Sequence, residues 1–410
     1  MFARPRHILP LIILSQFLGT STWFAGNAIL PSLQQQWGIS GQALAPLTNS
    51  VQWGFIAGAL LFAALAVSDR ISPRILFSIC STLCGLSSLL IAAFAQSLDQ
   101  VLWLRFFSGM MLAGVYPVGM KIAAGWYPQG LGRALGYFIG ALVLGTATPH
   151  LLSSLPDVSW RQVMAMVGGA ALLGGSLILI WVPDGPALFK GAPFNLRALV
   201  EIVKCRPLRA AVGGYLGHCW ELYAVWAIAP MWLAAWNQLH NAALNPAFCT
   251  SMIIASGSFG CVVAGVWSRR FGSRAVAEKM LIISGGCCLL SPLMMLAPLW
   301  MVLPFWFIWG FSVVADSAQF SALSAQAAPP EVVGSALTLI NAFGYATTAL
   351  GVEAVALLLG VVHVKWLAWC LLPGPLLGIW SLRGFKKRGT DESATEEQGQ
   401  LATTPPSDTH

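Results

Sequence analysis

The sequence predicts an all-α integral membrane protein whose twelve transmembrane helices form two six-helix bundles related by a pseudo-two-fold repeat. Three observations support this prediction: an apolar composition with few charges, twelve apolar runs of spanning length, and two short motifs that recur about half a chain length apart. The composition also excludes a soluble enzyme, a nucleic-acid-binding domain and a disordered chain.

Charge is scarce in this chain of 410 residues. Apolar residues make up 57% of it and charged residues only 9%, whereas a soluble protein has roughly 25% charged residues. The 22 Lys and Arg and the 15 Asp and Glu are too few to cover the surface of a soluble protein of this size. The net charge of +7 therefore bears on orientation in a membrane, and we expect no nucleic-acid partner.

A transmembrane helix needs about 20 mostly apolar residues. Twelve such runs lie between the Pro, Gly and charged residues that interrupt them. We place them near residues 8–30, 46–67, 75–96, 101–126, 131–153, 162–183, 210–236, 247–267, 277–297, 299–323, 332–359 and 364–382. A membrane β-barrel would show alternating segments of about ten residues, which this sequence lacks, so we expect helices.

The distribution of basic residues predicts the orientation. An even number of spans places both termini on one side, and 18 of the 22 Lys and Arg fall on that side, in the termini and the loops that connect there. The other side holds only Arg161 and Lys365, while Arg105 and Lys121 lie within the fourth span. Because cytoplasmic loops carry an excess of Lys and Arg, we expect a multi-pass protein of the cytoplasmic membrane with both termini cytoplasmic.

Two motifs recur at nearly one offset, which indicates an internal duplication. Residues 68–74 read Ser-Asp-Arg-Ile-Ser-Pro-Arg after the second span, and residues 268–274 read Ser-Arg-Arg-Phe-Gly-Ser-Arg after the eighth span, 200 residues later. The pattern P-x-x-x-G-x-A-L occurs at residues 128–135 and again at 330–337. Both matches lie in equivalent loops of the two halves.

The duplication divides the chain into parts. We expect an N-terminal six-helix bundle over residues 1–183, a cytoplasmic linker loop over 184–209, a C-terminal six-helix bundle over 210–383 and a disordered cytoplasmic tail over 384–410. In secondary transporters built from such repeats, the substrate site lies between the halves at the middle of the membrane. The layout therefore favours a transporter.

At these motifs the chain resembles the major facilitator superfamily, over residues 8–382. Asp69, Arg70 and Arg74 match part of its loop signature G-x-x-x-D-R-x-G-R-R/K, and Arg105 and Gly109 match its fourth-span signature R-x-x-x-G. The resemblance implies that spans 1, 4, 7 and 10 line a central cavity. It also implies that Asp69, Arg70 and Arg74 form a conformational latch of the outward-facing state, with Asp69 pairing across the cytoplasmic gap between the bundles.

Two signatures of branches within that family are incomplete or missing. The antiporter signature G-x-x-x-G-P-x-x-G-G keeps Gly136 and Gly140 but lacks the Gly-Pro pair, which weakens the case for drug–proton antiport. The paired arginines of the nitrate branch are missing from residues 46–67 and 247–267. The subfamily therefore stays undetermined.

Ionisable side chains within spans are costly and mark functional sites. In the seventh span, His218 and Glu221 are three residues apart, and in the tenth span Asp316 precedes Gln319 by three. We expect Glu221, Asp316 and His218 to carry the proton or bind substrate, and by the resemblance Glu221 and Asp316 face one water-filled space. The alternative for each is a polar contact that only packs helices together.

Polar and aromatic side chains of other spans complete the predicted cavity. Most share helical faces at i,i+3, i,i+4 or i,i+7 spacing or lie beside a helix-breaking proline. Arg105 is added as a charged residue about one turn inside the outer end of the fourth span, where it could orient an acidic substrate or only anchor the helix at the interface. The candidates are Trp23, Asn27, Asn49, Trp53, Arg105, Tyr116, Gln319, Asn341 and Tyr345.

Three functions are compatible with a membrane protein of this composition. We expect a proton-coupled secondary transporter that moves a small solute by alternating access. The alternative is an uncoupled facilitator, a uniporter of a small organic or anionic solute, in which Glu221 and Asp316 bind substrate without carrying a proton. A membrane enzyme is disfavoured because H-E-x-x-H and G-x-x-x-x-G-K-[ST] are both missing.

The expected partners follow from that function. They are a small-molecule substrate, protons and the lipid bilayer, and we expect a monomer. The nine cysteines include no C-x-x-C motif, so we expect no metal and no cofactor.

The predicted orientation can be tested with cysteines introduced between Lys190 and Arg209. We expect a membrane-impermeant maleimide to label them only after the cell membrane is permeabilised, because this basic segment should be cytoplasmic. Labelling in intact cells would contradict the topology.

Overall fold

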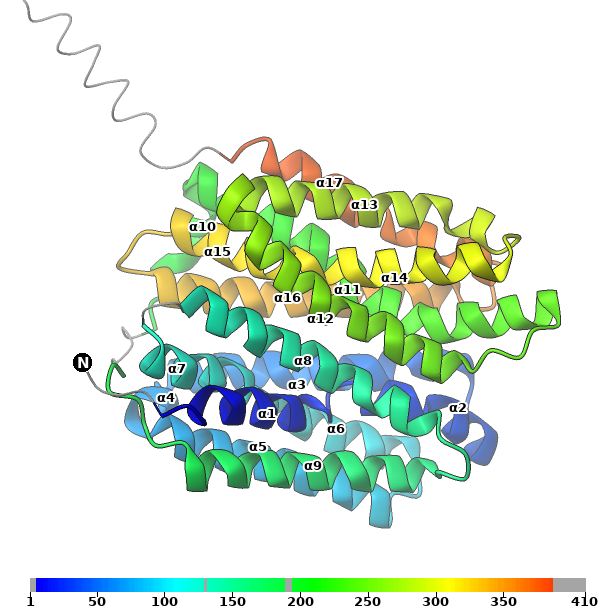
Figure 1. The fold of residues 1–410 in the computed structure, drawn as a ribbon, viewed down its shortest axis with the longest axis horizontal. Helices are drawn as coiled ribbons and strands as arrows, with labels where there is room; N and C mark the ends of the chain where they lie inside the picture. The colour runs from blue at the N-terminus through cyan, green and yellow to red at the C-terminus, as the bar shows by residue number, and fades with distance from the viewer. Residues whose placement is uncertain (1–4, 129–130, 189–193, 386–410) are drawn as a thin grey trace, which may run out of the picture.

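The computed structural model describes residues 5–128, 131–188 and 194–385, and these fold into an elongated bundle of helices (Figure 1). The structure is 83% helical. Ten of its helices or joined helix pairs are long and apolar enough to cross a membrane. The predicted all-α, twelve-span architecture is confirmed, since α11 and the η2–α17 segment supply the other two spans.

The first half of the chain supplies six spans. Its helices are α1 (Ile8–Thr20), α2 (Ala25–Trp37), η1 (Gly41–Ala43), α3 (Leu44–Ala64), α4 (Val67–Arg70), α5 (Pro73–Phe94), α6 (Leu98–Leu112), α7 (Tyr116–Trp126), α8 (Leu131–Ser153) and α9 (Trp160–Trp181). Within this half, α5 packs along α9 and α3 along α6.

The second half repeats the plan. Its helices are α10 (Arg197–Lys204), α11 (Arg206–His240), α12 (Pro246–Phe271), α13 (Ser273–Met294), α14 (Leu299–Ala315), α15 (Ser317–Ala327), α16 (Val333–Leu358), η2 (Val364–Leu371) and α17 (Pro373–Leu382). Here α12 packs along α14, and α11 packs along both α16 and α17. The halves meet where α8 packs on α12 and α3 on α16, so Figure 1 shows the two sets of helices as adjoining layers.

Three predicted spans are each split into two helices, at the α1–α2, α6–α7 and α14–α15 junctions. At the first junction, hydroxyl groups compete for backbone carbonyls, since Thr20 donates to Gln16 and Ser21 to Leu18, both at 2.7 Å. At the second, Pro117 has no N–H to continue the helix. The last span also differs from the single helix expected over 364–382, because Pro373 starts a new helix after a 3₁₀ segment.

Glycines allow α3 and α6 to pack with their backbones almost in contact. A Cβ atom at Gly109 would lie 2.0 Å from the carbonyl oxygen of Val51, and one at Gly54 would lie 1.9 Å from that of Phe106. Small residues at such crossings are typical of membrane helices, where close van der Waals packing drives association. The fourth-span pair of Arg105 and Gly109 therefore includes a residue with a clear packing role.

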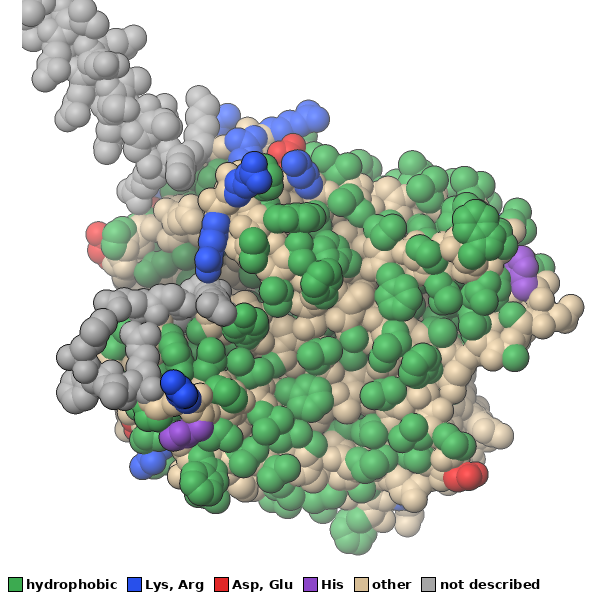
Figure 2. Space-filling view, viewed as in Figure 1, with side chains coloured by type: hydrophobic (Ala, Val, Ile, Leu, Met, Phe, Trp, Pro, Cys, Tyr) green, Lys and Arg blue, Asp and Glu red, His purple; other side chains and the backbone are tan. Residues whose placement is uncertain are grey.

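Basic residues gather at one end of the bundle, which we call the basic end. It holds Arg6, Arg70, Arg74, Arg197, Lys204, Arg206, Arg209, Arg269, Arg270, Arg274 and Lys279. On the face shown in Figure 2, Lys and Arg cluster toward this end, while the middle of the face is apolar. We call the other end the opposite end.

The expected linker and tail are only partly described. Residues 184–209 were expected to be a loop, but they contain the helix α10, which packs against α11 and α16. The backbone N–H of Asn195 donates to the hydroxyl of Ser335 at 2.9 Å, which ties this segment to the second half. The expected tail over 384–410 lies outside the described residues except for its first two.

The α3–α6 crossing predicts a strong effect of Gly109→Ala. Because the new methyl group would overlap the Val51 carbonyl oxygen, the helices must separate, at a cost of about 1–3 kcal/mol. We expect a lower melting temperature of the purified protein. Gly169→Ala in α9 is the matched control, since a Cβ there meets no atom within 4 Å, and equal melting temperatures for both variants would contradict this packing.

Candidate functional site

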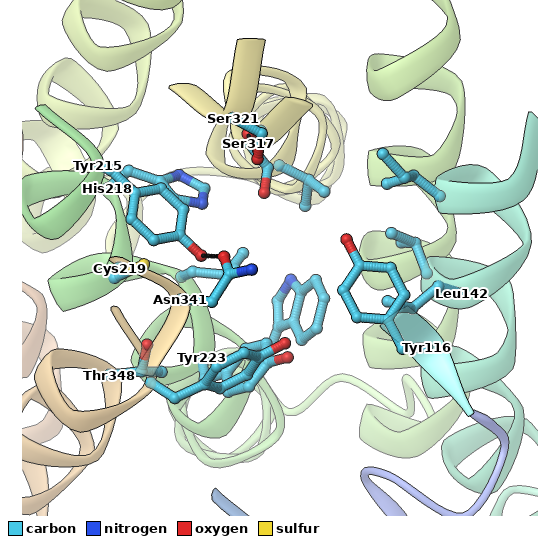
Figure 3. Close-up of a pocket in the computed structure, with 16 residues that line it drawn as sticks. Tyr116, Leu142, Tyr215, His218, Cys219, Tyr223, Ser317, Ser321, Asn341 and Thr348 are labelled. Atoms are coloured by element: carbon cyan, nitrogen blue, oxygen red, sulfur yellow. Dashed lines mark hydrogen bonds between the residues drawn. The ribbon is translucent and has the colours of Figure 1, made fainter. Parts of the chain in front are cut away.

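A cavity lies between the two halves, near the middle of the bundle (Figure 3). Residues from α7, α8, α11, α14, α15 and α16 surround it. They are Tyr116, Ile139, Leu142, Val143, Tyr215, His218, Cys219, Leu222, Tyr223, Trp226, Val314, Ser317, Ser321, Asn341, Tyr345 and Thr348. Four of the six tyrosines of the chain therefore meet at one site.

The polar groups of the cavity are mostly neutral. Tyr215 donates its hydroxyl hydrogen bond to Oδ1 of Asn341 at 3.2 Å, as the dashed line in Figure 3 marks. Ser317 and Ser321 line the wall formed by α15. Among the described lining residues none is Lys or Arg, and His218 is the single group that can become a cation near neutral pH.

His218 forms a buried ion pair with Asp316. Its Nδ1 atom lies 2.8 Å from Oδ1 of Asp316, and both side chains are 1% exposed. Asp316 occupies the junction between α14 and α15, where its carbonyl accepts from the N–H of Gln319 at 2.9 Å. The rings of Tyr215 and Phe320 flank the imidazole, each with its centroid 5.9 Å away. The pair thus lies beside the cavity at a break in the tenth span.

Glu221 points elsewhere, which corrects the expectation that it shares one water-filled space with Asp316. Its carboxylate accepts from Nε1 of Trp309 at 2.7 Å and from the hydroxyl of Ser284 at 2.9 Å, inside the second bundle. It does not line the described cavity. A spacing of i,i+3 rotates a side chain by about 60° around a helix, which directs Glu221 toward α13 and α14 while His218 faces the cavity.

Aromatic rings from both halves meet on the side of the cavity toward the opposite end. Trp23 stacks on Tyr345 with centroids 5.6 Å apart, and Phe55 packs on Tyr345 at 4.4 Å. Phe24 meets Tyr223 at 5.1 Å. Three interhalf hydrogen bonds lie farther along. Nδ2 of Asn49 donates to the carbonyl of Ala349 at 3.1 Å and to Oε2 of Glu353 at 3.4 Å, and Nδ2 of Asn245 donates to the carbonyl of Ser154 at 3.1 Å. The halves are therefore joined on that side.

Of the nine cavity candidates, the structure places Tyr116, Asn341 and Tyr345 in the lining, and Trp23 directly behind Tyr345. The other five do not line the described cavity. Trp53 is 45% exposed on the outer surface, although its i,i+4 neighbour Asn49 is buried against α16. Asn27 donates to Thr48 at 2.7 Å. Gln319 is buried.

Arg105 holds the α1–α2 junction instead of lining the cavity. Its guanidinium group is fully buried and donates to the carbonyls of Thr22 and Trp23. A break in a helix frees such carbonyls, and a buried arginine satisfies two at once. This contact positions Trp23 for its stacking on Tyr345.

The predicted latch residues lie at the basic end. Asp69 pairs with Lys121 of α7, with 2.5 Å between Oδ1 and Nζ, so this contact stays within the first half instead of crossing the gap between bundles. Lys121 also donates to the carbonyl of Ser68 at 2.8 Å. Arg70 is exposed, and Arg74 is half-buried. Their role as a latch in another conformation stays a prediction.

Sequence reasoning missed the neutral half of the site. Tyr215, Tyr223, Trp226, Ser317 and Thr348 line the cavity but carry no formal charge, and a search for ionisable groups passes over them. The available signal was the crowding of scarce tyrosines, because two of six lie on α11 within one run of nine residues.

Two six-helix halves around a polar central cavity define the fold of a two-bundle membrane transport protein. The sequence matches the family model of the Major Facilitator Superfamily over residues 12–352. The chain belongs to the Major Facilitator Superfamily.

Individual relatives agree with this assignment. The chain is 29% identical over 182 residues to the 4-hydroxybenzoate transporter PcaK of Pseudomonas putida, which covers 43% of this chain and 40% of that protein. It is 29% identical over 127 residues to the D-galactonate transporter of Escherichia coli O6:H1, covering 30% and 29%. The chain thus matches less than half the length of each relative.

A solved structure extends the likeness to the whole fold. A point mutant of the nucleoside transporter NupG matches with a TM-score of 0.71 at 14% identity, over 92% of this chain and 100% of that chain. At this identity the likeness concerns the fold alone.

The buried Arg105 predicts a loss of stability in Arg105→Met. The variant leaves the carbonyl of Trp23 without its donor and that of Thr22 with only the long bond of 3.4 Å from the N–H of Ala25, and a buried unsatisfied group costs about 1–3 kcal/mol. We expect a clear drop in melting temperature. Arg161→Met is the control, because Arg161 donates to the carbonyls of Ala92 and Ala95 at 2.7 and 2.9 Å but is only partly buried. An equal drop in the control would contradict the special role of burial.

Proposed function

We propose that the protein is a secondary active transporter that moves a small solute across the cytoplasmic membrane by alternating access, coupled to protons through His218 and Asp316. The observation that carries this proposal is the buried His218–Asp316 pair, 2.8 Å apart at a break in the tenth span and beside a cavity between the halves. Family membership and the two-bundle fold support the transport part of it.

The arrangement of contacts supports alternating access. Aromatic and polar contacts join the halves toward the opposite end, while α8–α12 and α3–α16 form the long surfaces along which the halves adjoin. Rocking of one bundle against the other around a fixed central site would break the first set of contacts and open the cavity on that side. The Asp69, Arg70 and Arg74 segment is then the proposed latch at the basic end.

The basic end supports an orientation with both termini in the cytoplasm. Arg70, Arg74, Arg269, Arg270 and Arg274 all lie there, as the positive-inside rule requires of the cytoplasmic side. The proposed division remains a bundle over residues 1–183, a linker over 184–209 and a bundle over 210–383.

The surroundings of the pair favour it as the proton carrier. The titratable groups packed near it are Tyr215, Cys219 and Glu221 of α11, Cys261 of α12, Tyr345 of α16 and Tyr116 of α7. A proton bound to the pair is thus held between apolar packing and the cavity, where solvent can reach it when either side opens. Glu221, bound by Trp309 and Ser284, lacks this access in the described conformation.

The relatives support a small organic solute. The names of two of them specify 4-hydroxybenzoate and D-galactonate, each a small carboxylic acid. The competing proposal is an uncoupled uniporter, in which the same pair binds substrate without moving a proton.

Transport assays in proteoliposomes distinguish proton-coupled transport from uncoupled uniport. A thermal-shift screen on the purified protein first selects a solute, starting with 4-hydroxybenzoate and D-galactonate, because a ligand of the folded state raises its stability. With a pH gradient imposed, we expect wild type to accumulate the labelled solute and Asp316→Asn to reach only equilibration, a loss of up to about tenfold for one proton per solute and a gradient of one pH unit. Accumulation by Asp316→Asn equal to wild type would contradict coupling through the pair.

Glu221→Gln is the matched control within the same bundle. The amide keeps an acceptor for Trp309 but places an N–H donor where Oε2 accepts from the Ser284 hydroxyl, so we expect gradient-driven accumulation to persist with a lower melting temperature. If Glu221→Gln abolishes gradient-driven accumulation while Asp316→Asn retains it, Glu221 carries the proton in place of Asp316. If the wild-type protein does not accumulate the solute under the gradient, the uncoupled uniporter is the remaining proposal.

A further inference from the structure

We infer that the central cavity binds a small aromatic monocarboxylate, with its carboxylate on Nε2 of His218 and its ring among the tyrosines and Trp226. This assignment rests on the transport function proposed above and names the substrate class of the same site. Four properties of the cavity carry it: a free imidazole nitrogen, a single cationic group, aromatic walls and neutral hydroxyls.

The first property is the unused nitrogen of His218. Nδ1 lies 2.8 Å from Oδ1 of Asp316, and Nε2 is buried with no hydrogen-bond partner among the described residues. Buried polar atoms in proteins almost always have a partner, so an orphan on the wall of a cavity indicates a ligand group. When the pair holds a proton, Nε2–H is a charged donor, and a carboxylate is the acceptor that forms the strongest hydrogen bond with it.

The second property is the number of charges. Among the described lining residues, His218 alone can become a cation, and Asp316 already lies on its other side. One incoming carboxylate and one proton leave the site with no net change in charge. A second carboxylate would be buried without a partner, which is costly in this environment. The site therefore favours monocarboxylates over dicarboxylates.

The third and fourth properties of the cavity, its aromatic walls and its neutral hydroxyls, indicate what the rest of the substrate looks like. Tyr116 of the first half and Tyr223 of the second half both point into the cavity (Figure 3), and Trp226 and Tyr345 of the second half also line it. Aromatic rings pack well against a planar ring in offset or edge-on geometry. Asn341 adds an amide to this wall, with its Oδ1 occupied by Tyr215. A ring with a small polar substituent fits these groups.

The proton balance of transport follows. The anion and one proton bind together, with the proton on the His218–Asp316 pair, and both leave on the other side. No bond within the substrate changes. The transported unit is neutral, so a membrane potential alone should not drive accumulation.

Equilibrium binding to the full-length protein in nanodiscs tests the assignment. The probes are radiolabelled benzoate and phenylacetate, with unlabelled benzamide and terephthalate as competitors. We expect benzoate to bind at least tenfold more tightly than the neutral benzamide or the dianionic terephthalate. The dissociation constant of benzoate should rise with pH, by up to about tenfold per unit as the pair releases its proton.

Variants identify the group that holds the carboxylate. We expect His218→Gln to weaken benzoate binding at least tenfold and to remove its pH dependence, while direct binding of radiolabelled benzamide changes less than twofold. Retained benzamide binding also shows that the variant is folded. His240→Gln is the matched control, because His240 lies on the same helix, stacks on Trp236 and contacts the carbonyl of Met295 far from the cavity, and it should bind benzoate as wild type does.

The outcomes separate this assignment from the proposed function. Equal affinity for benzoate and benzamide, no binding of either labelled acid, or unchanged benzoate binding by His218→Gln would each overturn the substrate class. None of these results depends on a pH gradient. Failure of gradient-driven accumulation, read in proteoliposomes, would instead overturn proton coupling.

Discussion

The cost of burying charge in an apolar environment governs how this structure is built. Two charged side chains that are buried within the membrane-spanning region, Arg105 and Asp316, meet partners that neutralise or solvate them. Arg105 donates hydrogen bonds to the carbonyls of Thr22 and Trp23, and Asp316 pairs with His218. Both contacts lie at breaks in spanning helices, because a break releases backbone groups and brings side chains of neighbouring helices within reach. The α14–α15 break also adjoins the central cavity, which Val314 and Ser317 line on its two sides.

The two halves share a plan but divide the chemistry between them. The first half contributes Tyr116 and the apolar side chains of α8 to the cavity. Its buried Arg105 donates to backbone carbonyls and does not line the cavity. The second half contributes the ion pair and most of the polar lining. The repeated loop motif also differs between the halves. Asp69 of the first half pairs with Lys121, whereas the corresponding position of the second half is Arg269. A duplicated scaffold thus carries one asymmetric site.

The success of each predicted cavity residue depends on the sequence feature from which it was predicted. Asn341 and Tyr345 were found from helical spacing and Tyr116 from its place before Pro117, and all three lie in the cavity. Glu221 was placed with Asp316 because the family resemblance implies that spans 7 and 10 both line the cavity, yet Glu221 accepts from Trp309 in another part of the bundle. Spacing along one helix defines a face only to within tens of degrees, and a helix in a bundle contacts several neighbours within that range.

By itself, the sequence determined the class of fold, the number of spans and the repeat, because these depend on hydrophobic length and on charge counts that are local or additive along the chain. Only the tertiary structure decided that His218 belongs with Asp316, 98 positions away, and that four tyrosines surround one cavity. Such pairings depend on how helices rotate and cross. That geometry follows from close packing, as where Gly54 and Gly109 let α3 and α6 touch, and no single span contains it.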